Sequence, residues 1–592
     1  MTSAITRRAV RIANSSGFYG DRDPAAREMV EGGPIDVLTG DYLAELTMLI
    51  LWKARRKDPD AGYARTALGH LEQVLGTCLD RGIKIVTNAG GLNPAAFARR
   101  AGELAGQLGL HPKIAYITGD DLLPRLAELR AAGHPLANMD TGQSLADVKA
   151  EPVTANAYLG GWGITAALGA GADVVVCPRV TDASLVTGPA AWWHGWARDD
   201  FDALAGAVVA GHVIECGPQA TGGNYSFLDE ITDRRYPGFP IAEVASDGSS
   251  VITKHPGTGG LVSVGTVTAQ LLYEIAGPEY ANPDVIAHFD TVRLAPAGPD
   301  RVAISGVRGS PPPATAKVAV NFAAGYRNTM TLVLTGLDIE AKAAWATEEL
   351  FGVLGGREQF EEVDVRLLRF DMPDAPSNEQ ATAHLRVTVK DRDPDKVGRR
   401  FSNATMELAL GGYAGFHTTT PPTPETSYGV YWPALVPSGL VRHTVVLPDG
   451  TARDIPHTPG GGPRRWTSPP RPHAAVRPAE PAERAPLGAI CGARSGDKGG
   501  NANIGLWTRT PEEFAWLEAY LTADRLRDLL TEAARLPVRR YELPRLRALN
   551  FVVTGLLGEG VAASTRPDPQ AKGLGEYVRS RYADIPVRLL RG

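Results

Sequence analysis

Cysteine is scarce in this chain: it has four, Cys78, Cys177, Cys216 and Cys491, in 592 residues. So few cysteines exclude a disulfide framework and fit a reducing compartment. No pair has C-x-x-C spacing, which excludes a zinc ribbon or a thioredoxin-type site. An excess of basic residues is also missing, because 61 Lys and Arg are balanced by 66 Asp and Glu, for a formal net charge of -5. Without a global basic field, nucleic-acid binding is a poor expectation.

Long apolar runs are missing as well. The longest, Leu46 to Trp52, is far shorter than the ~20 residues that span a bilayer. The arginines near Met1 are not followed by an apolar stretch like that of a signal peptide. We therefore expect a cytoplasmic protein without a membrane partner. Hydrophobic residues make up 43% and charged residues 21% of the chain, which excludes a largely disordered protein.

Proline marks the clearest division of the chain. Nine prolines lie between Pro456 and Pro486, and because proline fixes φ and removes a hydrogen-bond donor, we expect an extended linker over 456–486. The linker separates an N-terminal domain, 1–455, from a C-terminal domain, 487–592. The N-terminal domain divides further at about residue 250, into 1–250 and 251–455.

Short branched runs alternate with helical apolar spacing in the first part of the chain. Val10–Asn14 and Asp173–Pro178 are typical of buried strands. Pro94–Leu108, which Asn93 can cap, and Ala155–Leu168 have the spacing of helices. This alternation predicts an α/β region with a largely parallel sheet.

The pattern changes after Val251. Lys317–Phe322 and Thr331–Thr335 indicate two separate strands in a mixed α/β middle region. The last hundred residues alternate about four strands with helices, an order that predicts a small ferredoxin-like α+β domain.

Small and polar residues follow several of the predicted strands. In an open parallel sheet, ligands bind at the carboxyl ends of the strands. The candidate anion-binding residues at these ends are Asn88, Gly90, Gly91 and Arg179, and Asp182 is a candidate acid or base. The alternative is that βα turns are polar and glycine-rich in any protein.

A glycine-rich loop precedes the helical pattern at Val262. Lys254, Thr258, Gly259 and Gly260 supply a cation, a hydroxyl and a flexible backbone that suit a phosphate or carboxylate, and His255 is a candidate acid or base. It is not a Walker loop, because no Lys-Ser or Lys-Thr follows a G-x-x-x-x-G. An ordinary glycine-rich helix start is the alternative.

Glu215 and Cys216 form the third candidate, an acid/base pair or a nucleophile. The neighbouring carboxylate raises the pKa of the thiol, so a buried structural cysteine is the alternative. Gly222, Gly223 and Asn224, in the same glycine-rich turn, are candidate substrate contacts. The spacing of His212, Glu215 and Cys216 fits no standard metal site, so we predict no metal ligand.

Charged residues also interrupt a predicted hairpin of the C-terminal domain. These are Arg494, Asp497 and Lys498, followed by Asn501. A plain hairpin needs only a Gly or Asn-Gly turn, so the additional charges indicate contact with a ligand or with another domain.

Several long stretches together resemble the acyclic terpene utilisation protein A (AtuA-like) family. They include SGFYGDR, NAGGLNP, GADVVVCPRVTDASL, HVIECGPQATGGNY, VITKHPGTGGLVSVGTVTAQLLYEI and ARSGDKGGNANIGLW. The resemblance implies a large N-terminal domain, a small C-terminal domain with a ferredoxin-like fold, and a role in the breakdown of citronellol- or geraniol-type terpenes alongside acyl-CoA-processing enzymes. It carries over no catalytic residue. Ala13-Asn14-Ser15-Ser16 replaces the more glycine-rich turn of similar proteins.

Our leading hypothesis is an enzyme that acts on a branched acyl-CoA or related carboxylate by acid/base chemistry at carbon, as a hydratase, dehydratase or lyase. One alternative is a metal-dependent phosphate-ester or nucleotide hydrolase with Mg²⁺ on Asp120, Asp121 or Asp182. Another is a non-catalytic scaffold that binds acyl-CoA or partner enzymes. We predict no separate cofactor; CoA enters as part of the substrate, and a divalent metal belongs only to the hydrolase alternative. The size of the chain favours a homo-oligomer.

Overall fold

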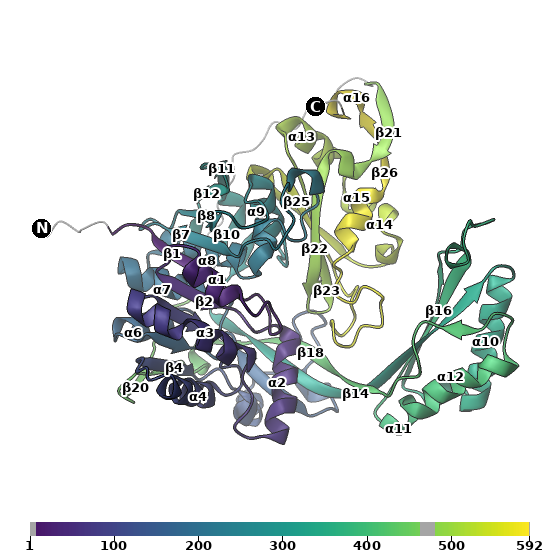
Figure 1. The fold of residues 1–592 in the computed structure, drawn as a ribbon, viewed down its shortest axis with the longest axis horizontal. Coiled ribbons are helices and arrows are strands. Elements are labelled where there is room, and N and C mark those ends of the chain that lie inside the picture. The colour runs from purple at the N-terminus through teal and green to yellow at the C-terminus, as the bar shows by residue number, and fades with distance from the viewer. Residues whose placement is uncertain (1–6, 462–479, 591–592) are drawn as a thin grey trace, which may run out of the picture. The chain divides into compact units, whose positions relative to one another are not determined.

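The computed structural model describes residues 7–461 and 480–590, so most of the predicted linker lies outside the described residues. The chain divides into two compact units. Unit 1 comprises Met1–Asn321, Tyr431–Val561 and Asp568–Gly592, and unit 2 comprises Phe322–Val430 and Ala562–Pro567. Figure 1 traces the elements of both units from purple at the N-terminus to yellow at the C-terminus.

An 11-stranded sheet forms the centre of unit 1, in the order β11-β12-β8-β7-β1-β2-β3-β6-β4-β19-β20. The five strands from β1 to β4 in this order pair in parallel, which confirms the predicted parallel sheet. The strands on either side of them pair antiparallel. The parallel strands are β1 (Val10–Asn14), β2 (Val37–Gly40), β3 (Lys84–Thr87), β6 (Val174–Val176) and β4 (Ile114–Thr118). The flanking strands are β7 (Pro240–Val244), β8 (Ser250–Lys254), β12 (Arg301–Ser305), β11 (Arg293–Pro296), β19 (Thr444–Val446) and β20 (Ala452–Asp454).

Helices cover both faces of this sheet. On one face, α1 (Ala25–Glu31), α3 (Thr66–Arg81) and α4 (Pro94–Gln107) bury their apolar stripes against the strands. Asn93 caps α4 as expected, because its Oδ1 accepts from the backbone N–H of Ala96 at 3.3 Å. On the other face lie α6 (Trp162–Gly169), α7 (Ser184–His194) and α8 (Phe201–Ile214). Coverage of both faces explains why the parallel strands are apolar at almost every position.

Two of the predicted elements are different in the structure. Ala155–Leu168 is not one helix: β5 (Pro152–Ala157) ends before the pair Gly160-Gly161, and α6 begins after it. The two glycines break an apolar pattern that otherwise has helical spacing. The two strands predicted within 317–335 are one long strand, β14 (Thr315–Thr335).

Unit 2 is a sheet with helices packed on one face. The part of β14 that lies in this unit pairs with β16 (Thr382–Asp391), which pairs with β15 (Glu362–Arg369). Side chains such as Met330, Leu385 and Val387 pack with Phe351 and Phe401 of α10 (Ile339–Leu354) and α12 (Arg399–Gly411). Its α/β character agrees with the predicted mixed region, but the unit begins at Phe322, whereas the change of pattern lies near Val251.

The C-terminal domain has the predicted ferredoxin-like fold, drawn in yellow-green and yellow in Figure 1. Its antiparallel sheet has the order β22-β23-β25-β24. The sheet packs on helices through side chains such as Ile504, Leu517, Leu526 and Val578. The elements are β22 (Cys491–Lys498), β23 (Asn501–Thr508), α13 (Pro511–Tyr520), α14 (Ala523–Leu529), β24 (Val538–Leu543), β25 (Ala548–Val553) and α15 (Leu574–Ser580).

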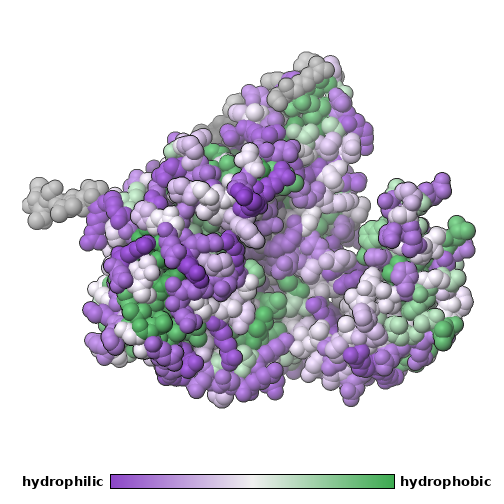
Figure 2. All heavy atoms as spheres, in the orientation of Figure 1, coloured by the Kyte–Doolittle hydropathy of each residue, from purple (hydrophilic) through white to green (hydrophobic). Residues whose placement is uncertain are grey.

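The visible face of the molecule is mostly hydrophilic, and its hydrophobic residues lie in separate patches (Figure 2). Within the described residues, no helix combines the length and the apolar character that a membrane span requires.

Candidate functional site

The site begins where the end of β1 meets the end of α8. Asn14, the last residue of β1, donates from Nδ2 to the carbonyl oxygens of Ile214 (2.7 Å) and Glu215 (2.9 Å). These carbonyls at the end of a helix have no partner within it, and Asn14 satisfies them. A Cβ on Gly17 would lie 2.9 Å from the backbone carbon of Cys216, so only glycine allows this approach. Asn14 and Gly17 thus fix the backbone that carries Glu215 and Cys216.

The next two strands place Asp41 beside this corner. Asp41 follows β2 and is buried, and its Oδ1 accepts from Asn88 Nδ2 at 2.6 Å and from the N–H of Leu43 at 3.2 Å. Asn88, at the end of β3, accepts in turn from the N–H of Tyr42 at 2.8 Å. Burial raises the pKa of Asp41 well above its ordinary value, and the charge of Asp182 raises it further.

Arg179 and Asp182 follow β6. The Arg179 guanidinium is buried 4.4 Å from the centre of the Tyr158 ring; its Nη1 donates to Leu43 O at 3.1 Å and lies 3.2 Å from Asp182 Oδ1. Asp182 is the more accessible partner, since 29% of its side chain is exposed. The negative charges of Asp182 and Asp41 hold the pKa of Arg179 well above its ordinary value although burial alone would lower it.

Glu215 is the most deeply buried of the predicted catalytic carboxyl groups, with only 8% of its side chain exposed. Burial raises its pKa well above the ordinary value, and Asp182 and Glu274 raise it further, whereas Lys498 lowers it. Its position directly after α8 disfavours a negative charge as well, because the carboxyl end of a helix is itself negative. Burial, the neighbouring carboxylates and the helix end thus all favour the protonated form of Glu215.

His212 lies one helical turn before Glu215, with Nδ1 3.2 Å from Glu215 Oε1. This contact is not an ion pair, because burial lowers the pKa of His212 to about 4 and the imidazole is neutral at pH 7. A neutral imidazole needs no counter-ion. The ring packs instead against Tyr280 and Phe289, at centroid distances of 5.0 and 5.4 Å.

Cys216 is the neighbour of Glu215 in the chain. Burial raises the pKa of its thiol well above the ordinary value, and Glu215 and Glu274 raise it further. A thiolate is the nucleophilic form of cysteine, and this environment suppresses it. The arrangement favours a positioning role for Cys216 over a nucleophilic one.

The ferredoxin-like domain supplies cations from β22. Arg494 donates through Nη2 to Gln219 Oε1, in the loop after Cys216, and its guanidinium lies 4.2 Å from the centre of the Tyr273 ring. Lys498 Nζ lies 5.9 Å from the centre of the Tyr280 ring, and its charge acts on both Glu215 and His212. The charged hairpin predicted from the sequence therefore lies beside the Glu215 loop, far from it in the chain.

A second pair of opposite charges adjoins Lys498. Lys572 Nζ lies 3.5 Å from both Asp497 Oδ1 and Glu274 Oε1. Burial, and then the charge of Glu274, raise the pKa of Asp497 to about 7 although Lys572 opposes the shift. Glu274 has a positive φ of 55° and its N–H donates to Asn503 Oδ1 at 2.8 Å, so the second domain holds this strained residue after α9 (Val264–Leu271).

We call the central group the carboxyl-end cluster. It consists of Asp41, Arg179, Asp182, Glu215, Cys216, Glu274 and Lys498. It holds four carboxyl groups, and three cations face them: Arg179, Lys498 and, 3.5 Å from Glu274 Oε1, Lys572. Asp41, Arg179 and the Glu215 side chain are buried, and the other residues are partly exposed. A surplus of carboxyl groups in a dry environment retains protons at neutral pH, which is the condition for general acid and base chemistry. The residues that sequence reasoning did not select are Asp41, Glu274 and the pair Tyr273 and Lys572.

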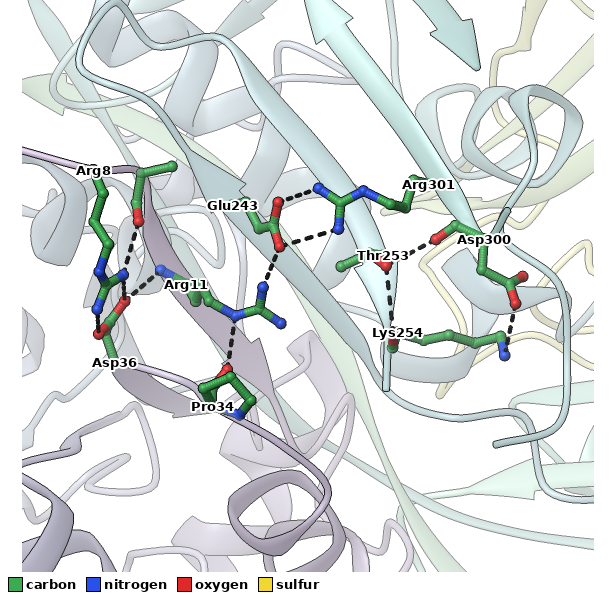
Figure 3. A network of polar contacts seen from close by, with 10 residues as sticks. Arg8, Arg11, Pro34, Asp36, Glu243, Thr253, Lys254, Asp300 and Arg301 are labelled. Carbon is green, nitrogen blue, oxygen red and sulfur yellow. Dashed lines mark hydrogen bonds and ion pairs between the residues drawn. The ribbon is translucent and has the colours of Figure 1, made fainter. Parts of the chain in front are cut away.

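The Lys254 loop is held by a different set of contacts. Lys254 Nζ lies 3.1 Å from Asp300 Oδ2 and donates to the Thr258 carbonyl oxygen at 2.8 Å, so an internal carboxylate already faces the predicted anion-binding cation. Figure 3 shows Lys254 and Asp300 at one end of a polar network along the sheet. At its other end, Arg8 pairs with Asp36, and Glu243 lies between Arg11 and Arg301.

The other predicted residues of this loop have packing roles. His255 Nε2 lies 2.9 Å from Met29 O, against the end of α1. A Cβ on Gly259 would lie 1.8 Å from Arg235 O, and one on Gly260 would lie 2.2 Å from Thr221 O. Close backbone approach therefore accounts for the glycines, and Thr258 Oγ1 closes the turn by donating to His255 O at 2.7 Å.

The remaining predicted contacts form turns near the cluster. Gly90 and Gly91 make the tight turn after Asn88, in which Gly91 has a φ of 52°. Gly222 and Asn224 have φ values of 105° and 59°, and Gly223 N donates to Pro218 O at 2.9 Å. Asn501 donates to Asp140 Oδ1 at 2.7 Å and accepts from Gly555 N at 2.9 Å, outside the cluster.

No group of three or more His, Cys, Asp or Glu side chains within residues 7–461 and 480–590 is placed to hold a metal ion. Asp120 is instead bound to Asn156, whose Nδ2 donates to its Oδ2 at 2.7 Å. Burial raises the pKa of Asp120 to about 7.

The fold and the cluster define an α/β protein with a ferredoxin-like domain that reaches a cluster of carboxyl groups and cations beside the carboxyl ends of the parallel strands. The chain belongs to the acyclic terpene utilisation family, whose family model AtuA matches residues 10–447. The AtuA ferredoxin-like domain matches residues 485–582. This membership links the chain to the utilisation of acyclic terpenes. No curated protein and no solved structure matches the chain.

Proposed function

We propose that the protein is an enzyme of acyclic-terpene breakdown that adds or removes water at a branched acyl-CoA or related carboxylate. One observation carries the proposal: four carboxyl groups share a partly buried cluster with three cations, beside the carboxyl ends of the parallel strands. Such a surplus costs stability, since each buried carboxyl group must lose hydration or hold a proton. A cluster of this kind at a strand-end crevice is typical of catalysis.

We assign the role of general base to Asp182 and the role of general acid to Glu215. Asp182, in contact with Arg179 and partly exposed, is the base that removes a proton from the carbon next to the substrate carbonyl. The electron pair left on that carbon forms a carbon–carbon double bond as the hydroxyl on the next carbon leaves. Glu215, protonated, gives its proton to that hydroxyl, which departs as water. The reverse sequence adds water, and Arg179 and Lys498 offset the negative charge that develops.

Solvent exchange tests these roles separately. The protein is incubated in D₂O with a panel of branched 3-hydroxyacyl-CoA esters, followed by mass spectrometry. We expect deuterium at the carbon next to the carbonyl and loss of water. Asp182→Asn should abolish both, whereas Glu215→Gln should lose elimination by at least ~10²-fold and retain exchange. Neither exchange nor water loss with any ester, with or without Mg²⁺, would contradict the proposal.

A further inference from the structure

A cavity of about 480 Å³ opens on the α6 side of unit 1. Its wall on α6 consists of Trp162, Thr165, Ala166, Gly169 and Ala170, which recur at the spacing of one helix face. The opposite wall consists of Arg198, Arg453, Ile455 and Pro456. The volume lies in the range that small-molecule sites occupy.

The polar groups of this cavity are mostly cations. The Arg198 guanidinium lies 4.6 Å from the centre of the Trp162 ring and donates through Nη1 to Pro456 O (2.8 Å) and Thr458 Oγ1 (3.5 Å). Both acceptors are neutral, so these bonds leave the charge of Arg198 uncompensated. Arg453, in β20, is exposed on the same wall.

One carboxylate lies near these cations. Asp284 acts electrostatically on Arg198, but its Oδ2 accepts from the N–H of Gly161 at 2.6 Å and the side chain is buried at the start of α6. Two guanidinium groups against one carboxylate leave the cavity with a surplus of one positive charge. The complementary ligand carries a single negative charge.

Trp162 contributes an aromatic face to the wall. The side chain is buried with a residue exposure of 9%, and the Arg198 guanidinium lies 4.6 Å from the centre of its ring. Its Nε1 is itself buried, so the ring and not the N–H is the part of Trp162 that a ligand would meet.

The rest of the wall is small and apolar. Ala166, Gly169, Ala170 and Ile455 leave room for hydrocarbon and offer it no polar partner. We propose that this cavity binds an aliphatic monocarboxylate, with its carboxylate at Arg198 and Arg453 and its hydrocarbon chain along α6 and the Trp162 ring. The proposal is independent of the chemistry assigned to Glu215.

Calorimetric titration with octanoate tests the site. We expect saturable binding, and at least about tenfold weaker binding of octanamide, which has the same chain without the charge. Acetate, the head group alone, should bind weakest. Arg453→Gln and Trp162→Phe should each weaken octanoate binding about three- to tenfold, and Arg99→Gln, a surface arginine on α4, should leave it unchanged.

Glu215→Gln separates this site from the carboxyl-end cluster, because it should also leave octanoate binding unchanged. Arg453 is exposed, so the fold of Arg453→Gln is expected to persist, and circular dichroism checks it. No binding of octanoate, equal binding of octanamide, or loss of binding only in Glu215→Gln would each overturn the proposal.

Discussion

The polar network of Figure 3 and the carboxyl-end cluster are both built on the central sheet of unit 1, and they handle charge differently. In the network, each carboxylate faces a cation: Asp36 faces Arg8, Glu243 faces two arginines, and Asp300 faces Lys254. In the cluster, four carboxyl groups face three cations, and the pKa values of Asp41 and Glu215 rise well above their ordinary range.

The two regions use the same residue types, so composition does not distinguish them. Paired charges on neighbouring strands of a sheet hold those strands together and require no further explanation. Unbalanced carboxyl groups in a dry interior oppose folding, and they persist where an activity needs them. The balance of charge, more than the presence of charged residues, therefore identifies the candidate site.

The strongest test of this comparison is a matched pair of glutamate substitutions. Glu215→Gln should reduce turnover by at least ~10²-fold because it removes the transferable proton, and it should not lower the stability of the protein. Glu243→Gln should lower the free energy of unfolding by about 1–3 kcal/mol, since it breaks two ion pairs, with turnover nearly unchanged. Steady-state kinetics and urea unfolding measure both. A Glu215→Gln protein with full activity, or one that fails to fold, would contradict the difference we infer between the carboxyl-end cluster and the polar network.

A pair of lysine substitutions sharpens the comparison. Lys498 lowers the pKa of Glu215, so Lys498→Met should raise that pKa. Because Glu215 acts in its protonated form, the fall of activity at high pH should move to higher pH, with turnover at pH 7 changed by no more than about tenfold. Lys254→Met should leave the pH profile of kcat/KM in place. Identical profiles for both variants would contradict the role of Lys498.

The pH dependence of stability provides a third test, at Asp120 and Asp173. Burial raises the pKa of Asp120 to about 7, so the folded state keeps a proton that the unfolded state releases above about pH 4. The free energy of unfolding should therefore fall as pH rises from about 4 to 7, and Asp120→Asn should flatten that slope.

Asp173 should behave in the opposite way. Burial alone would raise its pKa, but the hydrogen bonds from Lys84 and from the Lys113 N–H, at 2.8 and 2.9 Å, hold it below its ordinary value. Its stabilising contribution is present above the ordinary pKa and is lost as the pH falls below it. Urea unfolding at a series of pH values measures how the free energy of unfolding changes with pH in each case. If Asp120 and Asp173 change it in the same direction, the two opposite pKa shifts are refuted.

The smallest effect is expected at Cys216. Its pKa is raised well above the ordinary value, so the thiol should resist iodoacetamide at pH 7.5 in the folded protein, and Cys216→Ser should keep turnover within about tenfold. Mass spectrometry of the labelled protein reads out the first result. Rapid labelling together with complete loss of activity in Cys216→Ser would restore the nucleophile hypothesis.

Local patterns predicted part of the central fold. β1 has the predicted bounds, and α4 differs from them by one residue, because each combines a clear apolar period with a turn or cap signal. The prediction of one helix over Ala155–Leu168 was wrong, because the apolar residues of β5 and α6 together have helical spacing across the two glycines that separate them. The helix α8 has apolar residues on all sides, so no helical period marks it.

The site was predictable only in part. Asp182 and Glu215 follow apolar runs and were selected for that reason, and the hairpin of Lys498 had more charge than a turn needs. Glu274 has no such signal, because its role comes from contacts with Asn503 and Lys572 of a distant domain. The Lys254 loop was misleading in the same way, since the partner that neutralises it, Asp300, lies on another strand connection.

The protonation state of Glu215 tests the account most directly. Infrared difference spectroscopy of the folded protein, comparing wild type with Glu215→Gln as a function of pH, resolves the C=O stretch of a protonated carboxyl group. We predict that this band persists at pH 7 in the wild type and is absent from the variant. A Glu215 side chain that is already fully ionised at pH 6 would contradict the central claim, because neither the surplus of protons nor the acid role would remain.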